Sequence, residues 1–134
     1  MRFFLDNTTS PFLARAVTTL EEGSDRHQVT HLHEKFAPNT PDIEWIKALG
    51  AEKDWVIISG DLRITRNAAE RQAWRESGLT AFFLKSAWAD QTIWPFSSRF
   101  LAWWPRIVAQ AQMTAKGKGF LVPFSGQRFE DVLR

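Results

Sequence analysis

Two aspartates follow the two most apolar short segments of the chain. Asp6 comes directly after Arg2–Leu5, and Asp61 comes two residues after the end of Trp55–Ser59. Both segments have the length and character of buried strands. In an open parallel sheet, ligands bind in the crevice at the carboxyl ends of the strands. If these two strands are neighbours, Asp6 and Asp61 lie together in that crevice.

Two further acids, Asp42 and Glu44, lie in the first turns of a helix that Thr40-Pro41 predicts. Carboxylates that gather without a compensating lysine repel one another unless a cation neutralises them. Oxygen ligands without cysteine or histidine select Mg²⁺ or Mn²⁺. Such an ion can activate water and stabilise an in-line displacement at phosphorus. The four acids together therefore predict a site for metal-dependent phosphodiester chemistry.

Each acid also has a structural interpretation when it is taken alone. Asp42 could simply complement the helix dipole, and Glu44 could pair with a lysine one turn later. Asp61 could cap the turn that follows it. Asp6 is harder to explain in this way, because Ser10 already supplies the N-cap of the next helix. The joint occurrence of the acids is what favours a site.

The composition indicates one folded domain, residues 1–134. The net charge of +2 and the pI near 9.3 do not by themselves indicate nucleic-acid binding. The absence of cysteine excludes disulfides and thiolate metal sites, and it fits a reducing cytoplasm. The first residues do not have the pattern expected of a signal peptide, and no apolar run approaches the ~20 residues needed to span a bilayer. We therefore expect a cytoplasmic protein that does not contact a membrane.

Apolar patterning predicts strands that alternate with helices. The expected strands are Arg2–Leu5, Gln28–Leu32, Trp55–Ser59, Thr80–Leu84 and Phe120–Phe124. Helices are expected after Pro11, after Pro41, over Asn67–Ser77 and from Phe100 to Ala111, where Pro105 should kink the helix or start a new one. This alternation predicts an α/β fold with a mostly parallel five-stranded sheet between helices. We expect the first strand to be central, with the strand order 3-2-1-4-5 or a close variant, and Pro123 to mark a sheet edge.

Two arginines follow Asp61 closely. Arg63 and Arg66 could line a path for phosphate groups beside the acidic crevice. Arginines on a helix are more often simply solvated, so their interpretation depends on the crevice itself.

The stretch from Trp88 to Trp104 is rich in tryptophan. Together with the tail from Ser125 to Arg134, it suits a protein interface, where tryptophan anchors are enriched. We expect it to bind a second copy of the chain, as a homodimer, or another protein. The alternative is that these tryptophans fill a thick core.

Three short motifs resemble those of the PIN-like nucleases, in particular the short proteins related to VapC-type toxins. They are Phe4-Leu5-Asp6-Asn7, the helix start Pro41-Asp42-Ile43-Glu44-Trp45-Ile46 and Ile58-Ser59-Gly60-Asp61. The resemblance covers Arg2 to about Phe124 and implies a three-layer α/β/α sandwich with metal-dependent ribonuclease activity. It assigns the first-strand acid to Asp6, the helix-borne acid to Asp42 or Glu44, and the third-strand acid to Asp61. The fourth acid usual in PIN domains has no clear match, and Asp90 is the candidate in that region.

The resemblance thus implies an Mg²⁺- or Mn²⁺-dependent endoribonuclease that acts on RNA as the toxin of a toxin–antitoxin pair, with an antitoxin protein as its partner. Two other classes remain open. A non-catalytic interaction module would keep the fold and lose the metal. A receiver-like phospho-acceptor domain would share the topology, but it wants an acidic pair at the first strand, where this chain has Asp6-Asn7. The sequence argues against a haloacid-dehalogenase-like phosphatase, because that class needs a second aspartate two residues after the first, where this chain has Thr8.

Overall fold

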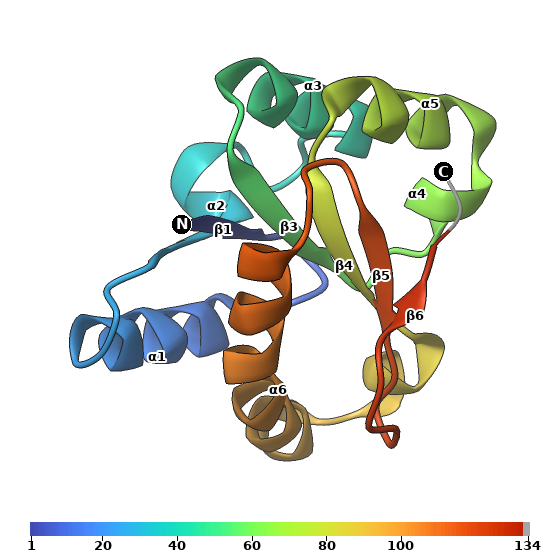
Figure 1. Cartoon of the computed structure of the whole chain (residues 1–134). Coiled ribbons are helices and arrows are strands. Elements are labelled where there is room, and N and C mark those ends of the chain that lie inside the picture. Colours follow the sequence, from blue (N-terminus) through green and yellow to red (C-terminus); the bar gives the residue numbers. More distant parts are fainter. Residues whose placement is uncertain (133–134) are drawn as a thin grey trace.

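One six-stranded sheet organises the computed structural model, which describes residues 1–132 (Figure 1). Its strands are β1 (Arg2–Leu5), β2 (Gln28–His31), β3 (Trp55–Ser59), β4 (Thr80–Leu84), β5 (Gly119–Val122) and β6 (Glu130–Asp131). They lie in the order β2-β1-β3-β4-β5-β6, and only β6 pairs with its neighbour in the antiparallel direction. The predicted α/β fold with a parallel five-stranded sheet is confirmed, with β6 added at one edge.

Helices cover both faces of this sheet. They are α1 (Pro11–Glu22), α2 (Leu32–Lys35), α3 (Asp42–Glu52), α4 (Arg63–Arg66), α5 (Ala68–Ser77), the 3-10 helix η1 (Ser86–Asp90) and α6 (Ile93–Met113). Figure 1 shows α1 and α6 on one face and α3 with α5 on the other. In the described part of the chain, we find no helix long and apolar enough to cross a bilayer.

The core has two halves, one on each face of the sheet. Successive side chains of a strand point to opposite faces, so Phe3 and Leu5 of β1 pack toward α1 and α6, while Phe4 packs toward α3 and α5. The ring centroids of Phe3 and Trp104 are 4.8 Å apart, and those of Phe4 and Trp45 are 5.1 Å apart. Every residue of β3 and β4 is buried, as expected for strands covered on both faces.

Polar caps fix where two of the helices begin. The hydroxyl of Ser10 accepts the backbone N–H of Phe12, and Pro11 is the first residue of α1. The side chain of Asn67 accepts the backbone N–H groups of Ala69 and Glu70 at the start of α5. Side-chain acceptors of this kind satisfy N–H groups that have no partner inside the helix. The expected helices after Pro11 and over 67–77 are therefore confirmed.

The strand order corrects one expectation. β1 is second from the edge, and β3 rather than β1 lies near the centre of the sheet, so the order 3-2-1-4-5 was wrong. The reason lies in β2, where Gln28 is exposed and Thr30 is half-buried. A strand with so little apolar surface fits an edge, and it pairs with β1 next to it in the chain. β3, which is buried throughout, takes the place between β1 and β4.

Other local expectations also change. Pro105 does not start a new helix: it lies inside the continuous helix α6, on its exposed side. Pro123 follows β5 rather than belonging to it, and β6 covers the outer side of β5. The strand expected over Gln28–Leu32 ends one residue earlier, because Leu32 begins the short helix α2, where the side chains of His31 and Glu34 form a reciprocal cap.

Candidate metal centre

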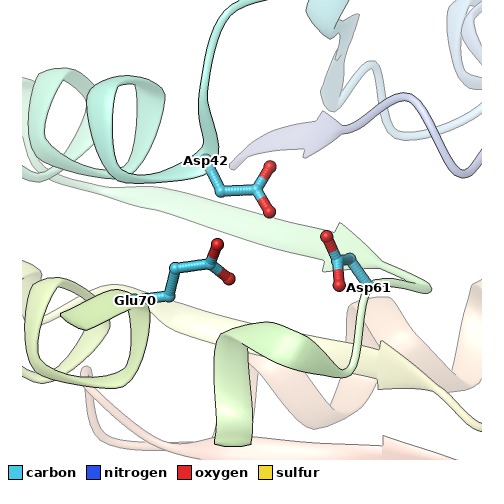
Figure 2. Close-up of side chains that lie close together, drawn as sticks. All are labelled: Asp42, Asp61 and Glu70. Atoms are coloured by element: carbon cyan, nitrogen blue, oxygen red, sulfur yellow. The ribbon is translucent and has the colours of Figure 1, made fainter. Parts of the chain in front are cut away.

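Three carboxylates meet at the carboxyl edge of the sheet. One oxygen each from Asp42, Asp61 and Glu70 lies within 4.8 Å of the other two. Figure 2 shows the three side chains pointing toward one another from the start of α3, the end of β3 and the start of α5. Within residues 1–132, this is the one group of three or more acidic or histidine side chains close enough to share a metal ion.

The topology explains why these three residues meet. β2, β3 and β4 run parallel in one sheet, so the helix that connects β2 to β3 and the helix that connects β3 to β4 both begin at its carboxyl edge. Asp42 and Glu70 both lie in the first turn of such a helix. Because α3 and α5 pack side by side, their first turns bring the two acids together next to Asp61, two residues beyond β3.

Asp42 is oriented by its own helix. The indole N–H of the buried Trp45 donates to Oδ1 of Asp42 at 3.1 Å. Burial and a side-chain hydrogen bond to Asp61 raise the pKa of Asp42 to about 7. Asp42 is therefore mostly protonated below about pH 7, where its proton lies in the hydrogen bond to Asp61.

Asp61 has the opposite electrostatic environment. Arg63 donates to it through Nε and Nη2, at 3.0 and 2.8 Å, and the backbone N–H of Arg63 donates to the same carboxylate at 3.0 Å. These hydrogen bonds from Arg63 lower the pKa of Asp61 to about 2. The carboxylate is therefore ionised at every physiological pH, as a metal ligand must be.

Glu70 contributes a carboxylate oxygen that has no hydrogen-bond donor among the described residues. Its Oε2 is inaccessible to solvent and has no hydrogen-bond partner among the described residues. Burial, and then the charge of Asp61, raise the pKa of Glu70. A buried carboxylate oxygen without a donor is costly unless something else binds it. Three oxygen donors of this kind fit a hard divalent cation such as Mg²⁺ or Mn²⁺.

Asp6 lies behind this group rather than in it. It is 2% exposed; the hydroxyl of Ser59 donates to Oδ2, and the backbone N–H of Thr8 donates to Oδ1 at 3.0 Å. The Ser59 hydroxyl in turn accepts the backbone N–H of Asp61 at 3.0 Å. Burial raises the pKa of Asp6. Asp6 is thus connected to Asp61 through Ser59.

The structure places only some of the acids predicted from the sequence at the site. Asp42 and Asp61 come together, and Asp6 lies one hydrogen-bonded residue away. Glu44 is exposed, because two residues along a helix turn it about 200° from Asp42. Asp90 is exposed at the end of η1 and is not part of the group.

Glu70 is the acid that sequence reasoning missed. It lies next to Arg71 in the predicted helix over 67–77, and charged neighbours of this kind are common on helices. The available signal was its spacing from Asn67, because an N-cap residue followed three positions later by Glu marks the first turn of a helix. That first turn is equivalent to the one that carries Asp42.

The fold and these carboxylates define a class of protein, a parallel α/β sandwich with an acidic site at the carboxyl edge of its sheet. A family model described as "PIN like domain" matches residues 1–86, well over half of the chain, including all three acids. The chain therefore belongs to the PIN-like domain family, whose fold is of the nuclease type. No curated protein and no solved structure matches the chain.

Proposed function

We propose that this protein is a metal-dependent nuclease that hydrolyses RNA phosphodiesters. The observation that carries the proposal is the group of Asp42, Asp61 and Glu70, three carboxylates from three elements at one sheet edge, in a chain of the PIN-like family. The uncompensated Oε2 of Glu70 and the proton kept by Asp42 are both features that a bound cation would resolve.

In this proposal the three carboxylates would hold Mg²⁺ or Mn²⁺, and the ion would supply Lewis-acid activation of water and of the phosphate group. Asp61 is already ionised, whereas Asp42 must lose its proton to become a ligand. Trp45 keeps the Asp42 carboxylate directed at the site. Asp6 is a positioning residue in this arrangement, because it acts on Asp61 through Ser59.

RNA as the substrate, and a role as the toxin of a toxin–antitoxin pair in the cytoplasm, are the finer part of the proposal. They are supported by the resemblance of three short motifs to those of VapC-type toxins and by Arg63 and Arg66, which lie exposed on α4 shortly after Asp61. The neighbouring reading frame tests the toxin role: a small DNA-binding protein encoded beside this one would favour it, and an unrelated neighbour would count against it.

Metal removal provides the first test of catalysis. The purified protein should cleave single-stranded RNA in Mn²⁺, should lose that activity in EDTA, and should regain it when excess Mn²⁺ or Mg²⁺ is added. Product length on a denaturing gel is the measurement. Cleavage that persists at full rate in EDTA would reject a metal-dependent mechanism.

One observation favours a second candidate, the non-catalytic interaction module. Both oxygens of Asp61 are already bound by Arg63, so the site has a counter-ion of its own. If the protein binds neither Mn²⁺ nor Mg²⁺ at millimolar concentration, this second candidate is the better description.

A protein partner is a separate proposal. Trp88 and Trp104 are buried, so they belong to the core, whereas Trp94 at the start of α6 is 82% exposed beside the exposed Ile93. The tail is folded as far as it is described: Phe129 packs on the core and β6 pairs with β5, while Leu133 and Arg134 lie outside the described residues. The proposed contact for a second copy or an antitoxin is thereby reduced to the surface around Trp94.

Sedimentation of wild type and Trp94→Ala, alone and with the product of the neighbouring gene, measures this contact. We expect Trp94→Ala to weaken association by at least about 2 kcal/mol, because solvent-exposed tryptophans are typical interface hot spots. Trp104→Phe, a change inside the core, serves as the control. Equal association of wild type and Trp94→Ala would remove this surface from consideration.

A further inference from the structure

The side chain of Arg63 is hydrogen-bonded to the carboxylate of Asp61, which is a metal ligand in the proposed nuclease. Its Nε donates to Oδ1 of Asp61 and its Nη2 donates to Oδ2, so the guanidinium binds both oxygens at once. The two side chains differ in their exposure: Arg63 is 78% exposed, whereas Asp61 is 11% exposed. One partner of this ion pair is fixed at the sheet edge, and the other reaches it from solvent.

A divalent cation and this guanidinium compete for the same oxygens. If Asp61 is a metal ligand, as the proposed function holds, a bound ion would stand within a few ångströms of the Arg63 charge, and like charges at that separation repel. Arg63 can leave without disturbing the core, since its side chain is exposed on the four-residue helix α4. The expected result of metal binding is therefore a guanidinium released beside the site.

A guanidinium released at this position has an obvious acceptor. Its planar group of donors matches the oxygens of a phosphate as well as it matches a carboxylate. Arg63 is two residues from Asp61, so it stays within reach of any phosphate held at the metal. We propose that Arg63 is an exchangeable counter-ion: it neutralises Asp61 in the metal-free protein and moves to the substrate phosphate when the metal binds.

This inference rests on the proposed function, and it adds an order of events to it. Metal binding and phosphate binding become coupled, because the same residue opposes the first and assists the second. Arg66 offers a matched comparison: it lies on the same short helix, has the same charge and is exposed, and no hydrogen bond or ion pair of its side chain is found among residues 1–132.

The first measurement is calorimetric titration of the full chain with Mn²⁺ at one pH. Arg63→Gln should bind Mn²⁺ about fivefold more tightly than wild type, the size expected when one exposed ion pair no longer has to be broken. Arg66→Gln removes the same charge without removing that ion pair, so its affinity should change by less than about twofold. Equal gains for the two variants would mean that only net charge matters, and the exchange would be rejected.

The second measurement is fluorescence anisotropy with a single-stranded phosphorothioate oligoribonucleotide, whose integrity is checked on a gel after each titration. Without metal, Arg63→Gln should bind it about as tightly as wild type, because Arg63 is held by Asp61. With Mn²⁺, the same variant should bind it about fivefold more weakly than wild type. An equal loss with and without Mn²⁺ would show that Arg63 contacts phosphate independently of the metal, and it would overturn the exchange.

The variant Asp61→Asn separates this inference from the proposed function. Loss of the carboxylate should free Arg63, so metal-independent binding of the oligonucleotide should rise, and that rise should be absent in the double variant Asp61→Asn, Arg63→Gln. If wild type and Arg63→Gln both fail to bind Mn²⁺, the metal site itself is wrong. If both bind Mn²⁺ equally, the metal site stands and the exchange alone is rejected.

Discussion

Asp61→Asn should reduce Mn²⁺-dependent RNA cleavage by about 1000-fold, since a metal ion contributes several kcal/mol of charge stabilisation to a phosphoryl transition state. The substitution keeps the shape of the side chain and removes the one carboxylate of the group whose pKa is lowered, to about 2, by hydrogen bonds from Arg63. Asp42→Asn and Glu70→Gln should each have a smaller but still large effect, because two carboxylates remain.

Glu44→Gln is the matched control for these variants. It removes an acid from the same region, but Glu44 is exposed and outside the group, so cleavage should stay within about twofold of wild type. All variants should keep the circular dichroism spectrum of the wild type. A result in which Glu44→Gln loses activity and Glu70→Gln keeps it would reverse our assignment of the two residues.

The affinity for Mn²⁺ should also depend on pH in one direction. Asp42 has a pKa raised to about 7, above its ordinary value, so it is protonated below that pH and must release the proton to bind a cation. Affinity should therefore rise as the pH is increased from 5.5 to 7.5. Wild-type affinity that is constant over this range would contradict Asp42 as a ligand.

Asp6→Ala should lower the free energy of unfolding by about 2–3 kcal/mol, a larger loss than we expect for Asp6→Asn. The alanine variant leaves the buried Ser59 hydroxyl and the partly buried Thr8 backbone N–H without their acceptor. Urea denaturation followed by tryptophan fluorescence is the measurement. Asp6→Asn keeps an acceptor for Thr8 and avoids burying a charge, so it should cost less than about 1 kcal/mol.

Metal affinity in the Asp6→Asn variant decides among three roles for this residue. A positioning residue that acts through Ser59 should lower Mn²⁺ affinity by about 10- to 100-fold when it is replaced. A direct ligand, as the resemblance to PIN-like nucleases implies, should produce the same loss as Asp61→Asn. Affinity identical to that of wild type would show that Asp6 serves folding alone.

Much of this fold could be predicted from the sequence, because strong local signals agree with the final structure. The apolar β-branched run of β3 allows few alternatives, and Ser10-Pro11 specifies both the start and the cap of α1. The strand order could not be predicted in the same way. The order depends on which edge of β1 each later strand pairs with. The polar β2 takes the outer edge of β1 and leaves the inner edge to β3, and nothing in the sequence of β1 itself indicates this.

The site shows the same division between local and tertiary information. Asp61 and Asp42 could be found because a strand end and a helix start each have a sequence signature. Glu70 required knowing that α5 lies beside α3, and the ion pair of Asp61 with Arg63 required side-chain geometry. Asp6 does follow a buried strand, as expected, but its oxygens face Ser59 and Thr8 rather than the three grouped acids, and no spacing rule indicates this.

The two-sided core has a consequence for any attempt to shorten the chain. The family match ends at residue 86, so it contains the acids but not α6. The apolar surface of Phe3, Val56 and Phe82 is buried with residues of α6, among them Trp104 and Ile107. A fragment that stops at residue 86 would keep every acid of the site and would expose to water the part of one sheet face that α6 covers, so it should aggregate instead of folding. The segment that identifies the family is therefore shorter than the segment that we expect to be needed for folding.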